Sequence, residues 1–184
     1  MKLAVAGSIS TIDVASSCIG WIRVCPDAER LARAAARIAL VDGFAAMGFA
    51  SPKRIELGIT LTDDTDQSHL NRRYRGQDRS TNVLAFRAWE PRTPAPADAP
   101  VLLGDIVLAF ETVAREAVQQ FKPFGDHLRH LIVHGVLHLL GYDHQNDADA
   151  VRMEGLEISI LAKLGVRDPY RNTNLHIERA TAFP

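Results

Sequence analysis

The sequence has no long apolar run, and its longest apolar stretch, around residues 131–140, is interrupted by histidines. A helix that crosses a bilayer needs about 20 consecutive apolar residues, so this stretch is too short to span a membrane. Near the N-terminus the apolar residues are interrupted by Ser8 and Asp13, which argues against a signal peptide. We therefore expect neither a membrane segment nor a secretory leader.

Cysteine is also scarce, since Cys18 and Cys25 are the only two and lack the CxxC spacing of a redox or zinc motif. This excludes a disulfide framework and suits reduced thiols in a cytoplasmic protein. The net charge of −1 gives the whole chain no attraction to nucleic acid, so RNA binding would need a local basic patch. The 184 residues, 47% hydrophobic and 23% charged, fit one globular domain with its own core.

Hydrophobic periodicity predicts alternating strands and helices. Strands are expected at residues 8–14, 54–62, 83–86 and 102–109. Helices are expected from Asp27 to about Val41, from Thr62 to Tyr74, and over residues 111–121, 125–141 and 147–165. The proline-rich residues 91–100 predict an exposed loop.

These elements predict a single α+β domain over residues 1–184. Its small mixed sheet of about four strands would be covered by helices, with the histidine-bearing helix of residues 125–141 packed on the sheet. Residues 167–184 are polar and contain a proline, and we expect them to form a surface-bound or frayed tail.

Three histidines lie in one short run, His134-Gly-Val-Leu-His138-Leu-Leu-Gly141-Tyr-Asp-His144. Residues four apart share one face of a helix, so His134 and His138 can point at a common centre. Gly141 can adopt the left-handed conformation that ends a helix, and the chain can then return His144 to the other two. Three imidazoles predict a site for one metal ion, most plausibly zinc, with a fourth position open to water.

This run resembles the metzincin signature His-Glu-x-x-His-x-x-Gly-x-x-His, with one departure. Gly135 occupies the position where those peptidases carry the glutamate that acts as general base. A metal ion can still lower the pKa of bound water toward neutrality. The substrate would then be one whose transition state favours positive charge over a carboxylate base, such as a phosphodiester.

The same residues resemble the YbeY endoribonucleases, also described as rRNA maturation factors. Residues 134–144 match every fixed position of the family signature His-Gly-x-Leu-His-Leu-x-Gly-Tyr-Asp-His. Residues 70–86 are similar to the family segment Leu-Asn-x-x-Tyr-Arg-Gly-Lys-Asp-x-Pro-Thr-Asp/Asn-Val-Leu-Ser-Phe, and residues 103–106 to its Leu-Gly-Asp-Ile/Leu strand. The departures are Gln77 for Lys, Ser80 for Pro and Ala85 for Ser.

The resemblance implies a zinc-dependent, single-strand-specific endoribonuclease that acts in 16S rRNA 3′-end maturation and ribosome quality control. It further implies a cytoplasmic protein with rRNA and the small ribosomal subunit as partners, together with a ribosomal protein and a ribosome-associated GTPase. His134, His138 and His144 would be the metal ligands. Two other functions stay open: a metallopeptidase-like hydrolase, and a non-catalytic assembly factor whose metal only holds the fold.

Four arginines lie at the end of the predicted helix over residues 62–74 and just after it. The resemblance places the family's functional arginine at Arg75, and a guanidinium there could clamp the scissile phosphate and stabilise developing charge. Arg72, Arg73 and Arg79 are candidates for contacts with the RNA backbone, although a solvated basic helix end is the alternative for each of them.

Several carboxylates lie near the histidines in sequence. Asp143, Glu154 or Glu157 could accept the free ring N–H of a ligand histidine, and surface ion pairs are the alternative. Asp105 could instead hold a loop by backbone hydrogen bonds. None of these residues is an evident general base, so either an activated water or the RNA 2′-hydroxyl could attack the phosphate.

Overall fold

A computed structural model of the chain describes residues 9–48, 52–90, 93–96, 99–144 and 146–171. The strands are β1 (Ile9–Ser16), β2 (Arg54–Thr62), β3 (Val83–Arg87) and β4 (Val101–Ala109). The helices are α1 (Ile19–Val24), α2 (Ala28–Met47), α3 (Asp64–Arg75), α4 (Phe110–Gln119), α5 (Phe124–Leu139) and α6 (Asp147–Lys163).

The four strands form one mixed sheet in the order β1-β2-β4-β3. β1, β2 and β4 run parallel, and the edge strand β3 pairs antiparallel with β4. Alternate residues of β2, among them Ile55, Leu57 and Ile59, point into the core, whereas Glu56 between them is exposed. The predicted α+β class with a small mixed sheet is confirmed.

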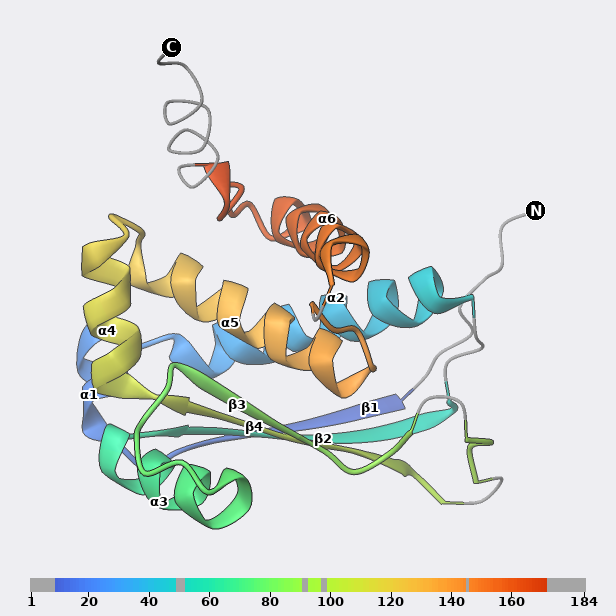
Figure 1. Ribbon diagram of the computed structural model, residues 1–184, viewed down its shortest axis with the longest axis horizontal. Coiled ribbons are helices and arrows are strands. Elements are labelled where there is room, and N and C mark those ends of the chain that lie inside the picture. The colour runs from blue at the N-terminus through green and yellow to red at the C-terminus, as the bar shows by residue number, and fades with distance from the viewer. Residues whose placement is uncertain (1–8, 49–51, 91–92, 97–98, 145, 172–184) are drawn as a thin grey trace.

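Helices cover one face of this sheet in two layers. α2 and α5 lie together on the sheet, with α6 packed outside them, while α3 lies on the opposite side (Figure 1). α5 is therefore enclosed by β3, β4, α2, α4 and α6, and most of its residues between Leu128 and Leu139 are buried. The prediction that the histidine-bearing helix packs on the sheet is confirmed, and its position makes that helix rigid.

The expected start of α3 is also confirmed. Asp63 is the N-cap residue, and its carboxylate accepts a hydrogen bond from the backbone N–H of Asp66 at 2.8 Å. At α2 the outcome differs, because Asp27 occupies the N-cap position without a capping bond and instead pairs with Arg30 at 2.8 Å.

One helix of the structure was not predicted from the sequence. The six-residue α1 was not expected, because isoleucine, valine and glycine are poor helix formers. Its Trp21 is fully buried, donates to the carbonyl of Thr62 at 2.9 Å and packs on Phe110 and Phe124, so tertiary contacts stabilise this helix.

α2 runs to Met47 rather than ending near Val41. Gly43 is an interior residue of this helix, where a side chain would come within 2.4 Å of the Leu140 side chain. Its function is to let α2 approach the end of α5 closely, and the helix ends at Gly48, whose φ is 72°.

The proline-rich loop and the C-terminal tail are described in part. Residues 93–96 are exposed and irregular, as expected, and residues 91–92 and 97–98 lie outside the described part of the chain. After α6, Pro169 is buried and Tyr170 is half-buried, while the rest of the expected tail, from residue 172, lies outside the described residues. Within the described ranges, no helix has both the length and the apolarity needed to cross a membrane.

Gly104 provides a test of the sheet. It lies at φ 139°, next to an irregularity in the β2–β4 register, and a Cβ there would be 2.1 Å from the carbonyl oxygen of Phe86. We expect Gly104→Ala to lower the free energy of unfolding by about 2–4 kcal/mol, because the neighbouring backbone must move.

The matched control is Gly155→Ala. Gly155 is exposed on α6, and a Cβ there meets nothing within 4 Å, so alanine should raise stability by up to about 1 kcal/mol. Denaturant unfolding of both variants measures the difference. Equal stability of the two variants would contradict the assigned β4 geometry.

Candidate metal centre

Two of the three histidines lie one turn apart on α5. The helix fixes their spacing, and both His134 and His138 are half-buried beside α6. Their ring centroids are 4.5 Å apart and their Nε2 atoms are 3.0 Å apart. The two rings therefore meet through the nitrogens that point away from the helix backbone.

Gly141 brings the third histidine to the other two. Its φ of 92° ends the helix, and the backbone N–H groups of Gly141 and Tyr142 donate to carbonyls of the last turn of α5. The chain then turns back, and the ring of exposed His144 lies 5.1 Å from that of His138 and 5.7 Å from that of His134. One ligand nitrogen from each of the three lies within 4.8 Å of the others, as the spacing predicted.

Hydrogen bonds determine which ring nitrogens carry protons. The Nδ1 of His134 lies 2.7 Å from the Oε1 of Glu157, and the Nδ1 of His138 lies 3.1 Å from the carbonyl oxygen of Tyr142. A carboxylate and a carbonyl only accept hydrogen bonds, so both Nδ1 atoms are donors. In the neutral imidazoles, each Nε2 atom therefore carries a lone pair.

Those two lone pairs face each other across 3.0 Å, an arrangement that a cation between them would stabilise. Zinc–nitrogen bonds of 2.0–2.1 Å in tetrahedral geometry place ligand nitrogens roughly 3.3 Å apart. A shared proton could also bridge the two Nε2 atoms, but it would not bind the third nitrogen, which His144 supplies. The donor set therefore fits a divalent first-row metal ion.

Burial also prepares His138 for this role. Its burial, and next the nearby His134 and His144, lower the pKa of His138 to about 4. The ring is therefore neutral near pH 7 and keeps its Nε2 lone pair available to a metal.

Of the three carboxylates considered from sequence, Glu157 makes the contact with a ring nitrogen. Its side chain is 1% exposed and its carboxylate faces α5 from α6. Asp143 instead accepts from the backbone N–H of His144 at 2.8 Å, and Glu154 is exposed. Burial opposes the ionisation of Glu157, but hydrogen bonds from His130 and His134 outweigh it and hold the pKa at about 2.

Arg75 lies at the end of α3 beside the edge strand. Its Nη2 donates to the carbonyl of Ala85 on β3 at 3.2 Å, and its side chain is exposed. Ala85 pairs in register with Ile106, whose side chain lies against the buried face of α5 at Gly135. Arg75 therefore lies at the edge strand of the sheet, and its described hydrogen bond is to β3 rather than to a histidine.

The other candidate arginines are spread over the same end of α3. Arg72 lies 3.9 Å from Asp78, Arg73 stacks over Tyr74, and Arg79 donates to Gln77. All three arginines are exposed. They form a local basic surface, and the structure does not bring them into contact with the histidines.

Sequence reasoning missed three residues that shape this region. Arg87 donates from β3 to the carbonyl of His138 at 3.1 Å. Gln67 and Asn71 are buried on α3 and bind the loop after it, Gln67 through Thr81 and Asn71 through the carbonyl of Arg79. Nearly every residue of α3 is polar, so no signal in the sequence singled out the last two.

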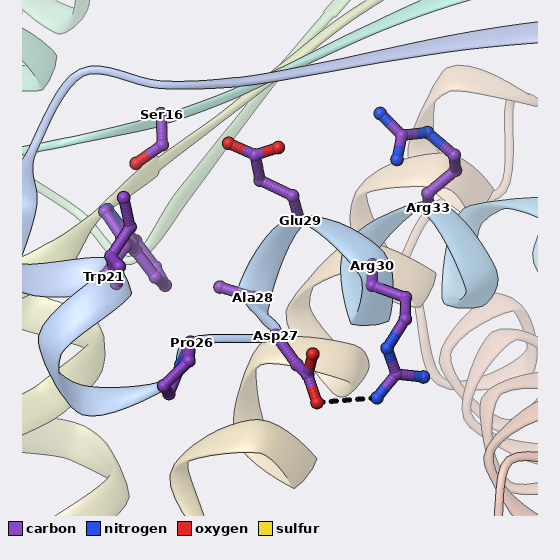
Figure 2. Close-up of a pocket in the computed structure, with 9 residues that line it drawn as sticks. Ser16, Trp21, Pro26, Asp27, Ala28, Glu29, Arg30 and Arg33 are labelled. Atoms are coloured by element: carbon purple, nitrogen blue, oxygen red, sulfur yellow. Dashed lines mark hydrogen bonds and ion pairs between the residues drawn. The ribbon is translucent and has the colours of Figure 1, made fainter.

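Asp105 lies exposed on β4, and Gly58 leaves room for its side chain, since a Cβ there would lie 2.1 Å from the Asp105 carboxylate. A separate pocket of about 380 Å³ lies at the end of β1 and the start of α2. It contains the Asp27–Arg30 ion pair, and none of its lining residues is a histidine (Figure 2). The pocket is therefore not part of the candidate metal centre.

The buried carboxylate can be tested without metal. Replacing Glu157 by Leu leaves the ring N–H groups of His134 and His130 without an acceptor in the protein interior. We expect Glu157→Leu to lower the unfolding free energy by roughly 2–4 kcal/mol, measured by denaturant titration in the presence of a chelator. The control is Glu154→Leu, at an exposed position of the same helix, which should change the unfolding free energy by less than about 0.5 kcal/mol. If Glu157→Leu is as stable as the wild-type protein, the hydrogen bonds of Glu157 with His130 and His134 do not stabilise the fold.

The sequence is similar to those of known proteins of one family. The family model described as Endoribonuclease YbeY matches residues 28–165. A protein of that name from Rhodopseudomonas palustris is 53% identical over 130 residues, which cover 71% of this chain and 77% of the relative. Another of that name, from Paramagnetospirillum magneticum, is 47% identical over 168 residues, which cover 87% of this chain and 96% of the relative.

The fold has a counterpart among solved structures. The solution structure of a Thermotoga maritima protein matches with a TM-score of 0.53 and 20% identity, covering 90% of this chain and 93% of the other. This likeness concerns the fold alone. The family model and the relatives establish more, and by both measures the chain belongs to the YbeY endoribonuclease family.

Proposed function

We propose that this protein is a zinc-dependent endoribonuclease that cleaves phosphodiester bonds of single-stranded RNA. One zinc ion per chain is held by His134, His138 and His144. The observation that carries the proposal is the pair of Nε2 lone pairs that face each other at 3.0 Å with a third imidazole beside them. Membership of an endoribonuclease family supports the reaction class.

The geometry of the three histidines leaves room for chemistry. Among the described residues, no fourth histidine, cysteine or carboxylate joins the group, and His144 is exposed on its outer side. An open position reached by solvent is typical of catalytic rather than structural zinc sites. When bound, the ion would supply a Lewis acid and lower the pKa of a bound water.

Arg75 is proposed to bind the scissile phosphate and to stabilise the charge that develops on it. From the end of α3 it donates to the carbonyl of Ala85 on β3, and Ala85 precedes Arg87 by two residues, a distance of about 7 Å along a strand. Arg87 in turn donates to the carbonyl of His138. Arg72, Arg73 and Arg79 are proposed to contact neighbouring phosphates. This local cationic surface is needed because the net charge of the chain is −1.

Glu157 is buried and accepts hydrogen bonds from ring nitrogens, so it is not free to act as a general base at the histidines. Two routes of attack therefore remain, one by water and one by the RNA 2′-hydroxyl. The end groups of the products separate them, because internal attack leaves a 2′,3′-cyclic phosphate and hydrolysis can leave a 5′-phosphate.

In the cell, the proposed role is 16S rRNA 3′-end maturation and ribosome quality control in the cytoplasm. The small ribosomal subunit, a ribosomal protein and a ribosome-associated GTPase are the proposed partners. Residues 1–184 are proposed to act as one catalytic domain, which is supported by the single hydrophobic core that joins the sheet to α2, α5 and α6.

The metallopeptidase alternative meets a physical obstacle at Gly135. A Cβ at this position would lie 3.1 Å from the Ile106 side chain, on the buried side of α5 against the sheet. A glutamate there would place its carboxylate among apolar atoms, away from solvent. The fold therefore has no place for the general base of that signature.

The proposal predicts that RNA cleavage depends on the histidines. Chelation should abolish cleavage of a single-stranded RNA, and added zinc should restore it. His138→Gln should lower the cleavage rate at least about 100-fold, because the metal loses one of three ligands. His69→Gln changes an exposed histidine on α3 and should cleave at the wild-type rate.

Circular dichroism and RNA binding complete this experiment. A folded His138→Gln variant that binds RNA without cleaving it supports catalysis. Loss of the fold would favour the non-catalytic assembly factor, and undiminished cleavage would refute the metal site. Chelator-sensitive cleavage of casein would instead revive the peptidase.

A second prediction concerns the guanidinium of Arg75. Arg75→Lys should lower kcat/KM for RNA about 10-fold and Arg75→Ala about 100-fold, because a lysine cannot bind phosphate through two N–H groups. Zinc content should stay at the wild-type value in both variants. Arg23→Lys, at an exposed position of α1, is the matched control. Wild-type cleavage by Arg75→Ala would remove Arg75 from the mechanism.

A further inference from the structure

Glu157 has two partners in addition to the candidate ligand His134. The hydroxyl of Tyr170 donates to its Oε2, and the Nε2 of His130, one turn before His134 on α5, lies 3.3 Å from the same oxygen. Tyr170 belongs to the segment after α6, where its backbone N–H is bound by Asp168 at 2.8 Å. The carboxylate thus joins α5, α6 and the chain that follows α6.

The chemistry of these groups fixes the direction of each hydrogen bond. The Oε2 of Glu157 lies against two groups that can donate, the Tyr170 hydroxyl and the Nε2 of His130, and a carboxylate oxygen accepts from both. Burial, and next the charge of Glu157, raise the pKa of Tyr170, so that its hydroxyl keeps the proton that it donates. Burial lowers the pKa of His130, whose ring remains neutral with its Nε2 proton toward the carboxylate.

We propose that Tyr170 and His130 are positioning residues of the metal centre, which hold the Glu157 carboxylate so that it fixes the ring of His134. This proposal rests on the proposed role of His134 as a metal ligand. Without the two donors at Oε2, the carboxylate can rotate about its terminal bond. The 2.7 Å contact of Oε1 with His134 then loses its fixed direction, and the Nε2 lone pair of His134 is no longer held toward its partners.

A role limited to packing would leave a different signature. The ring of Tyr170 packs edge-on against His130, with centroids 5.6 Å apart, and neighbouring Pro169 is buried. Tyr170→Phe keeps this ring contact and removes only the hydroxyl. A packing role therefore predicts unchanged metal affinity in that variant, whereas a positioning role predicts weaker binding.

The test measures metal binding by the full-length, metal-free protein. Zinc affinity is obtained by competition with a chromophoric chelator, and the coordination geometry by the visible absorption of the Co²⁺ form. We expect Tyr170→Phe to bind zinc about 10-fold more weakly than wild type, with altered Co²⁺ bands.

The matched control is Thr112→Val. Thr112 also donates a hydroxyl hydrogen bond to a carboxylate, that of Asp64 at 2.8 Å, but on α4 and away from the histidines. It should lose stability without a change in zinc affinity or Co²⁺ absorption.

A second pair of variants tests the other donor. His130→Gln keeps an N–H that can reach Oε2, whereas His130→Leu removes it, so the leucine variant should bind zinc about 10-fold more weakly than the glutamine variant. If circular dichroism shows that Tyr170→Phe does not fold, the zinc affinities of these two His130 variants test the positioning role instead.

The outcomes separate this proposal from the one on which it rests. Failure of the wild-type protein to bind zinc or Co²⁺ overturns both. Tight binding by wild type with equal affinity in Tyr170→Phe, or equal affinity of the two His130 variants, overturns only the positioning role.

Discussion

The hydrogen bond between the Glu157 carboxylate and the Nδ1 of His134 is the interaction on which the candidate site depends. A charge with 1% of its side chain exposed is tolerable only when donors surround it, and all of the described donors come from histidine and tyrosine side chains around the site. The same bond sets the tautomer of His134 and the direction of its free lone pair. The need of the buried Glu157 carboxylate for hydrogen-bond donors thus orients the ring of His134 at the candidate site.

The elements packed around α5 keep this geometry rigid. α5 lies between the sheet and α6, and Gly135 lets it approach Ile106 without an intervening side chain. Small residues have the same effect on its other side, where Gly43 of α2 lies against Leu140 and accepts a hydrogen bond from the Tyr142 hydroxyl at 3.0 Å. The backbone that carries His138 and the turn to His144 is therefore fixed by close packing.

Local patterns in the sequence were sufficient for some elements and not for others. The alternation in β2 and the capping residue of α3 are read correctly because their causes lie within a few residues. α1 and the second half of α2 were missed for the opposite reason. Trp21 contacts Thr62 and two phenylalanines from distant segments. Gly43 lies inside α2 because a side chain at this position would collide with Leu140 at the end of α5.

By itself the sequence determined the three histidines, their spacing and the turn at Gly141, because helical periodicity and the conformational freedom of glycine are local properties. It narrowed the supporting carboxylate to three candidates without choosing among them. Only the tertiary structure decided for Glu157, added Tyr170 and His130 to it, and placed Arg87 against the carbonyl of His138. These contacts join residues on different elements, and their distances depend on how helices and strands pack, which no short stretch of sequence specifies.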